Sequence, residues 1–133
     1  MLKGFEEQTH LLTEYEINKI LPIIVSGFKK RVGKENAITN SAICKALTEY
    51  YELKKISEPR VRKIIYYIRK SNIVPRLIAT SKGYWIANSK QELLDWKETI
   101  LGRVNAMQET LNYAEEQLSQ WDNPQTDKQK SLF

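Results

Sequence analysis

The fold of this 133-residue chain is decided by the stretch Ser57-Glu58-Pro59-Arg60-Val61-Arg62-Lys63-Ile64-Ile65-Tyr66-Tyr67-Ile68-Arg69-Lys70. Ser57 is a good helix N-cap and Pro59 is tolerated in a first helical turn, so the stretch predicts a helix that begins here. Its aliphatic side chains recur at helical spacing and define one buried face, made of Val61, Ile64, Ile65 and Ile68. The opposite face and its flanks carry basic and aromatic side chains: Arg60, Arg62, Lys63, Tyr66, Tyr67, Arg69 and Lys70.

Positive charge is concentrated around this helix. Residues 54–82 hold nine of the 21 Lys and Arg but only one acidic residue, so this segment is +8 in a chain of net charge +5. A local excess of this kind attracts phosphate and releases its counterions, which favours nucleic acid as a partner. A merely solvated basic face is the competing interpretation, but tyrosines between the basic groups favour contacts with phosphates, sugars and base edges together.

Two helices are expected before this one. Thr13 and Glu16 form a capping-box pattern for a helix that runs to about residue 32 and is bent at Pro22. Residues 37–39 predict a short extended piece. Asn40 is then expected to cap a second helix, whose inner face would comprise Ile43, Leu47 and either Tyr50 or Tyr51.

A β-hairpin is expected after the basic helix. Residues 77–80 and 84–87 are β-prone, and Gly83 supplies the positive φ that the tight turn between them needs. Arg76 at the base and Lys82 at the tip are expected to contact a phosphate backbone or to enter the minor groove. We expect at least one of Tyr84 and Trp85 to be structural.

A long helix is predicted for residues 89–121, with Ser89 as its N-cap. Apolar side chains follow a 3-4 heptad spacing along it, interrupted at Lys97. Packing against the first helix is one way to cover this stripe. Dimerisation is favoured because about 30 residues span roughly 45 Å, more than a small domain can cover. The residues expected at the dimer contact are Ile100, Val104, Met107, Leu111 and Leu118.

The order helix, strand, helix, turn, helix, hairpin resembles the winged helix-turn-helix superfamily over residues 13–87. Three stretches, 33–39, 56–65 and 78–87, are similar to small winged-helix proteins of phages and prophages, which also tend to carry a long helix after the wing. The resemblance implies a mainly α fold with a small β-hairpin wing (α+β), followed by a long C-terminal helix. It implies a protein of phage or prophage origin in the cytoplasm of a bacterial or phage-infected cell.

A second resemblance lies in Gln129-Lys130-Ser131-Leu132-Phe133. These residues are similar to the pentapeptide with which proteins bind the bacterial sliding clamp, and four of the five positions agree. Lys130 departs from the pattern, which usually has an apolar residue there. The resemblance implies that Gln129, Ser131, Leu132 and Phe133 contact a clamp, with Leu132 and Phe133 in an apolar cleft.

Catalysis is not expected. The chain has no glycine-rich phosphate loop and no nucleophile with a plausible histidine partner, and its single His10 and single Cys44 are too few for a zinc site. No apolar run approaches the 18 residues of a membrane span and no signal-peptide pattern occurs, so a soluble intracellular protein without cofactor or small-molecule substrate is expected.

The sequence therefore predicts an N-terminal arm (1–12), a winged helix-turn-helix domain (13–88), a long, dimerising helix (89–121) and a tail (122–133). The leading hypothesis is a noncatalytic protein that binds double-stranded DNA in replication or transcriptional control. Its contacts would come from the third helix and the hairpin: Arg60, Arg62, Lys63, Tyr66, Tyr67, Lys70, Arg76 and Lys82. The alternative is a protein-interaction module that docks on the sliding clamp or another replication factor.

Overall fold

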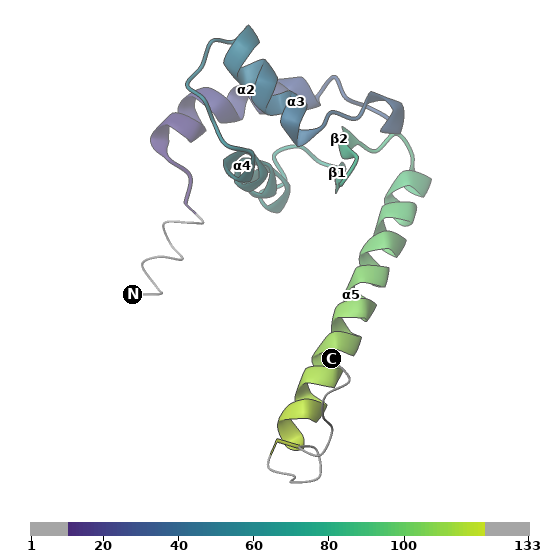
Figure 1. The fold of residues 1–133 in the computed structure, drawn as a ribbon. Coiled ribbons are helices and arrows are strands. Elements are labelled where there is room, and N and C mark those ends of the chain that lie inside the picture. The colour runs from purple at the N-terminus through teal and green to yellow at the C-terminus, as the bar shows by residue number, and fades with distance from the viewer. Residues whose placement is uncertain (1–10, 122–133) are drawn as a thin grey trace. The chain divides into compact units, whose positions relative to one another are not determined.

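The computed structural model describes residues 11–121 (Figure 1). Its elements follow one another as a π-helical turn η1 (Glu16–Ile20), α2 (Leu21–Phe28), a 3-10 turn η2 (Lys34–Asn36), α3 (Asn40–Lys45), a second π-helical turn η3 (Ala46–Tyr50), α4 (Glu58–Lys70), strands β1 (Leu77–Thr80) and β2 (Gly83–Ile86), and α5 (Lys90–Ser119). The chain divides into two compact units between Leu93 and Leu94. The fold is thus mainly helical, with a small antiparallel sheet and a long C-terminal helix.

The first helix begins as its capping box predicts. The Thr13 backbone N–H donates to Glu16 Oε1 at 2.8 Å, and the Glu16 N–H donates to Thr13 Oγ1 at 3.1 Å. The helix then widens into η1 just before Pro22, where the Leu21 N–H reaches back to the Glu16 carbonyl. A change of helical register next to a proline accommodates the N–H that proline lacks.

The predicted end of this helix near residue 32 is wrong, because α2 ends at Phe28. The chain leaves the helix early to pair with the second strand of the hairpin. Ile86 N–H donates to the Arg31 carbonyl at 2.7 Å, and Gly33 N–H donates to the Ile86 carbonyl at 2.9 Å. Backbone pairing with β2 therefore replaces the last helical turn.

The second helix begins one residue earlier than predicted. Its N-cap is Thr39, whose Oγ1 accepts from the Ala42 N–H at 3.1 Å, and Asn40 is the first helical residue. Ile43 and Leu47 are buried as expected. Tyr50 and Tyr51, however, are 81% and 48% exposed, and their rings meet edge to face at 5.1 Å between centroids. The π-helical turn η3 shifts the register after Lys45, so the predicted inner face stops at Leu47.

The strands of the hairpin lie within one residue of their predicted bounds. Leu77 pairs with Ile86 and Thr80 pairs with Gly83, which leaves a two-residue turn of Ser81 and Lys82. The expected extended piece is a single antiparallel bridge from Ile38 to Tyr84. Tyr84 and Trp85 are both buried, at 8% and 5% exposure, so both aromatic residues are structural.

One apolar core joins these elements in the first unit. The side chains of Phe28 from α2, Leu47 from η3, Ile64 and Ile68 from α4 and Leu77 from β1 are all buried in it. Fully burying a side chain of this size contributes about 1.5–3 kcal/mol, so α4 is held firmly by its apolar face. None of the helices within residues 11–121 is long and apolar enough to cross a membrane.

Candidate nucleic-acid interface

Helix α4 exposes its polar face to solvent, because its apolar face is buried in the core. Val61, Ile64 and Ile68 have no exposed surface, and Ile65 is 1% exposed. Ser57 caps the helix, its Oγ accepting from the Arg60 N–H at 3.4 Å, as the sequence predicts. The orientation of the outward side chains therefore follows from core packing.

The outward side chains of α4 line a shallow surface hollow. Five of the six interface residues predicted on this helix lie around it, together with Pro59: Arg62, Lys63, Tyr66, Tyr67 and Lys70. Tyr66 is 53% exposed and Tyr67 is 42% exposed, so both rings can contact a partner. The hollow combines cations with aromatic faces and contains no acidic side chain.

Cations also lie close to the exposed Tyr66 ring. Lys70 Nζ and Arg69 Cζ are each 5.9 Å from its centroid. Contacts at this distance attract weakly and hold the three side chains together on one surface. The buried Nε of Arg69 has no hydrogen-bond partner among the described residues.

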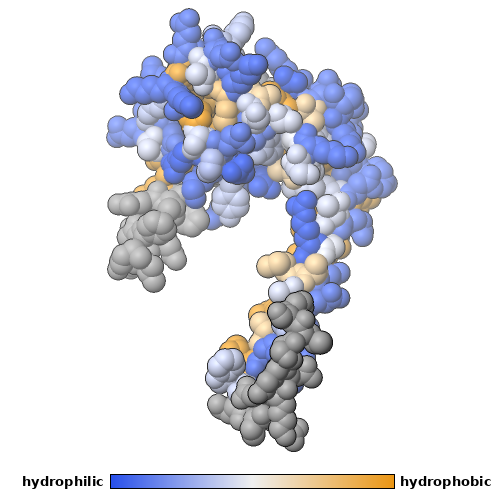
Figure 2. Space-filling model, viewed as in Figure 1, coloured by the Kyte–Doolittle hydropathy of each residue, from blue (hydrophilic) through white to orange (hydrophobic). Residues whose placement is uncertain are grey.

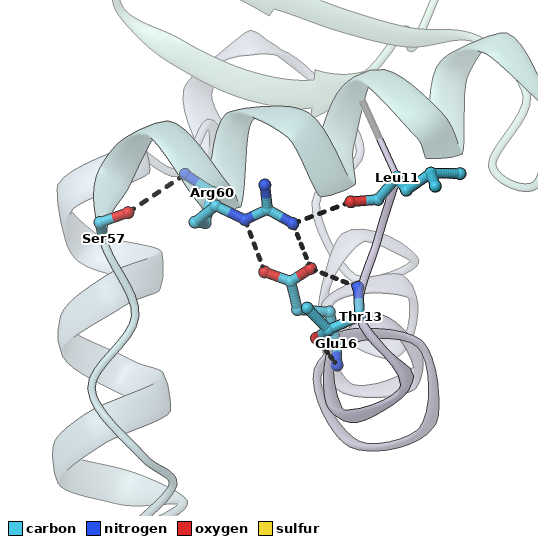
Figure 3. Close-up of polar contacts among 5 residues, drawn as sticks. All are labelled: Leu11, Thr13, Glu16, Ser57 and Arg60. Carbon is cyan, nitrogen blue, oxygen red and sulfur yellow. Dashed lines mark hydrogen bonds and ion pairs between the residues drawn. The ribbon is translucent and has the colours of Figure 1, made fainter. Parts of the chain in front are cut away.

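The remaining predicted residue of α4, Arg60, is used differently (Figure 3). Its Nε donates to Glu16 Oε2 at 2.8 Å, and its Nη2 bonds to Glu16 Oε1 and to the Leu11 carbonyl. The Glu16 side chain is 7% exposed and that of Arg60 is 27% exposed. The hydrogen bonds from Arg60 lower the pKa of Glu16, and those to Glu16 raise the pKa of Arg60.

This ion pair joins the start of the first helix to the start of α4. A bidentate arginine–carboxylate pair in a mostly buried position is strongly oriented, and the Nε and Nη2 donors of Arg60 are already occupied. Arg60 therefore has a structural role, because it links α4 to the start of the first helix. We do not count Arg60 among the interface residues. If its side chain turned to a phosphate instead, the Glu16 carboxylate would be left buried without its partner.

The hairpin places its two predicted cations at the surface. Lys82 is exposed in the turn, where its N–H donates to Thr80 Oγ1 at 3.1 Å. Arg76 is exposed at the start of β1, with a φ of 63°. Neither residue lines the hollow on α4.

A second hollow connects α4 with the hairpin turn. Arg62 lines both hollows, and Ser81 from the turn and Ser41 from α3 line the second. Asn40 also lines it, donating Nδ2–H to the Glu58 carbonyl at 3.0 Å and accepting from the Tyr84 hydroxyl at 3.1 Å. Asn40, Ser41 and Ser81 were not predicted at an interface, because they come from two separate segments and no local pattern marks them.

Burial raises the pKa of two further groups in this unit. Desolvation raises the pKa of the Tyr84 hydroxyl, which remains a hydrogen-bond donor to Asn40. Desolvation also raises the pKa of the partly buried Cys44 thiol, with a smaller effect from Glu58. A raised pKa lowers the thiolate fraction and therefore the nucleophilicity of Cys44 at neutral pH.

Within residues 11–121 no group of three or more His, Cys, Asp or Glu side chains could hold a metal ion.

The long helix α5 begins with its own cap. Ser89 Oγ accepts from the Glu92 N–H at 3.3 Å, while Glu92 Oε1 accepts from the Asn88 N–H at 2.9 Å and from Trp85 Nε1 at 3.1 Å. The backbone bond from Asn88, followed by the bond from Trp85, lowers the pKa of Glu92. These contacts fix the first turn of α5 to the hairpin.

No residue of α5 is buried. The residues predicted at a dimer contact are 37–74% exposed: Ile100, Val104, Met107, Leu111 and Leu118. Figure 2 shows apolar side chains at the surface along this helix. The residues that resemble the clamp-binding pentapeptide, Gln129, Ser131, Leu132 and Phe133, lie outside the described residues.

Comparison with known proteins adds no family to this description. No family model, curated protein or solved structure was found to match the chain.

Proposed function

We propose that the chain is a noncatalytic protein that binds double-stranded DNA as a member of the winged helix-turn-helix class. Helix α4 acts as the recognition helix, and the hairpin of β1 and β2 acts as the wing. The observation that carries this proposal is the hollow on α4, where three cations and two exposed tyrosines lie opposite a fully buried apolar face. Phosphates attract such cations, and tyrosines can pack against sugars and bases.

The electrostatics favour a polyanion over a small acidic ligand. The segment of residues 54–82 is +8, and its exposed cations extend from the hollow to Arg76 and Lys82. An ion pair on this face, Arg62 with Glu58, has an Nη1–Oε1 distance of 3.9 Å and is more than half exposed, so it restrains Arg62 little. Duplex DNA offers phosphates over such an extended surface.

The test is duplex binding of the full chain and a Lys63→Ala/Lys70→Ala variant, measured by fluorescence anisotropy at several salt concentrations. The parent is expected to lose affinity steeply as salt rises, because each neutralised phosphate releases counterions. Losing two phosphate contacts should reduce the salt slope, d log K/d log[salt], by about 2 and weaken binding at low salt.

The matched control is Lys19→Ala/Lys29→Ala, which removes the same charge from exposed positions in η1 and directly after α2. It should leave the duplex affinity within about threefold of the parent, because neither lysine lines the hollow on α4 and exposed charges outside the contact are screened by salt. Equal losses in both double variants would reject α4 as the interface.

A second function, docking on a bacterial sliding clamp, is proposed from the residues Gln129 to Phe133 alone. Changing Leu132 and Phe133 to alanine should abolish binding to a purified clamp, because these side chains would supply the apolar anchor. DNA binding should be unchanged in that variant. A full chain that shows no clamp binding in surface plasmon resonance would reject this second proposal.

A further inference from the structure

The first unit contains an apolar cavity that DNA binding does not use. It has a volume of about 330 Å³ and opens between α2 and the helical segment formed by α3 and η3. Ile23, Phe28, Ile43 and Leu47 supply its apolar lining. Ligand pockets in proteins have volumes of about 300–1,000 Å³ and mostly apolar walls, so this cavity is of the size and character that a small molecule needs.

Two small residues leave this cavity open. Gly27 lies on α2 and Ala46 on η3, and both line the cavity. A Cβ added at Gly27 would meet no atom within 4 Å. The space is therefore present because side chains that would fill it are missing from the facing helices.

The charged groups at the cavity are all positive. Lys30 and Arg31 follow the end of α2 and line the cavity, and no Asp or Glu does. Arg31 Nη1 donates to the Asn36 carbonyl at 3.3 Å, which holds its guanidinium near the cavity, whereas Lys30 is exposed. Tyr51, half exposed, adds an aromatic wall.

From this combination we infer that the cavity binds a small amphipathic anion, a molecule with an apolar body and one carboxylate, sulfonate or phosphate group. The apolar body is buried between α2 and α3, and the anionic group is paired with Lys30 and Arg31. A purely apolar ligand would leave the two cations unused. A polar metabolite would leave the Ile, Leu and Phe lining without a contact. The inference is independent of DNA binding, because the cavity residues and the hollow on α4 have no member in common.

Isothermal titration calorimetry of the full chain with sodium octanoate and with octan-1-ol tests the inference. Octanoate is expected to bind one per chain, and octan-1-ol at least about tenfold more weakly, since a contact between charged groups is worth about that factor. Equal affinity for the acid and the alcohol, or no heat from octanoate at millimolar concentration, would overturn the inference.

Variants locate the site. Gly27→Leu fills the cavity and should abolish octanoate binding, whereas Gly102→Leu, also at an open helical position, should leave it unchanged. Lys30→Ala should weaken octanoate binding by about tenfold, and the neighbouring Lys29→Ala should not, because Lys29 does not line the cavity.

Circular dichroism melting shows whether the Gly27→Leu variant is folded. If Gly27→Leu does not fold, Ala46→Leu replaces it, because a leucine at position 46 fills the same space from the facing helix. Octanoate binding that persists in a folded filled variant would overturn the inference. So would self-association of the parent that Gly27→Leu abolishes while octanoate fails to bind, because the cavity would then accept a second copy of the chain.

Discussion

At the scale of single residues, Gly83 holds the hairpin against the extended segment before α3. Its φ is 128°, a conformation that residues with a Cβ rarely adopt. A Cβ at this position would also lie 2.7 Å from the Ile38 carbonyl oxygen, which accepts the Tyr84 N–H. Positive φ was expected from the sequence, but this close approach depends on a strand bridge that only the folded chain forms.

We predict that Gly83→Ala lowers the free energy of unfolding by about 2–3 kcal/mol, because backbone strain and the clash add. Urea unfolding measured by circular dichroism gives the difference. Gly102→Ala is the control, since Gly102 has no positive φ and open space at its Cβ. It should raise stability by up to about 1 kcal/mol through helix propensity. A Gly83→Ala protein as stable as the parent would show that the turn adopts another conformation.

The ion pair of Glu16 with Arg60 makes a pH-dependent contribution to stability. Hydrogen bonds from Arg60 hold the pKa of Glu16 below its ordinary value in the folded chain. A carboxylate with a lowered folded pKa stabilises above its unfolded pKa, about 4.3, and this contribution is lost as pH falls through the folded value. The stabilising effect of the pair is therefore complete at neutral pH.

We predict that Glu16→Gln lowers the free energy of unfolding by about 2 kcal/mol at pH 7, because charge-assisted hydrogen bonds are lost. The difference from the parent should begin to shrink as pH falls below the unfolded pKa of about 4.3, and should continue to shrink until pH is below the lowered pKa of the folded parent, where its carboxyl is also protonated. Glu14→Gln, at an exposed position two residues away, is the control. A difference that is constant from pH 7 to pH 3 would mean that Glu16 acts through packing alone.

At the scale of elements, patterns within one segment predicted most of the fold. The buried face of α4, its cap at Ser57 and the paired strands of the hairpin follow from side-chain periodicity and turn residues near one another in sequence. The wrong predictions concern features that a pattern within one segment does not determine. The end of α2 depends on pairing with Ile86, and the exposure of Tyr50 depends on a π-helical turn.

In the candidate interface, too, the residues within one segment were predicted and the contacts between distant segments were not. Five of its cationic and aromatic residues lie on one helix, so helical periodicity places them together. Arg60 belongs to that helix by sequence, yet its partner Glu16 is 44 residues away. Asn40 and Ser81 reach the second hollow from different segments. Contacts that depend on tertiary packing cannot be derived from the spacing within one segment.

The remaining element, α5, has an apolar stripe that a single helix cannot bury by itself. Its 3-4 spacing over four heptads is the pattern of a two-stranded coiled coil. We predict that the parent chain is a dimer and that Val104→Glu/Leu111→Glu is a monomer, as measured by analytical ultracentrifugation. Two buried carboxylates at the contact would cost several kcal/mol.

The control for this prediction is Asn105→Glu/Asn112→Glu, which adds the same two charges one residue further along the helix, off the stripe. Both positions are exposed in the single chain. This variant should remain a dimer with nearly the parent dissociation constant. If the parent sediments as a monomer at all concentrations, the stripe has another partner.

At the scale of the whole molecule, the proposed DNA binding and the predicted dimerisation would involve different units. The basic segment of residues 54–82 lies entirely in the first unit, and the predicted dimer contact begins at Ile100 in the second. A dimer carries two copies of α4, so two half-sites on one duplex can be bound together. Binding at the second half-site is then intramolecular, which increases the overall affinity without any new contact.

We therefore predict that the two double variants fail in different ways. Lys63→Ala/Lys70→Ala should remain a dimer but lose duplex affinity, because its coiled coil is intact. Val104→Glu/Leu111→Glu should bind a duplex as one chain per half-site and about 100-fold more weakly than the parent, since the effective concentration that the dimer supplies is lost. Native mass spectrometry gives the stoichiometry and anisotropy gives the affinity. Full duplex affinity in the monomeric variant would show that one copy of α4 and its hairpin is sufficient, and that the stripe on α5 serves a purpose other than DNA binding.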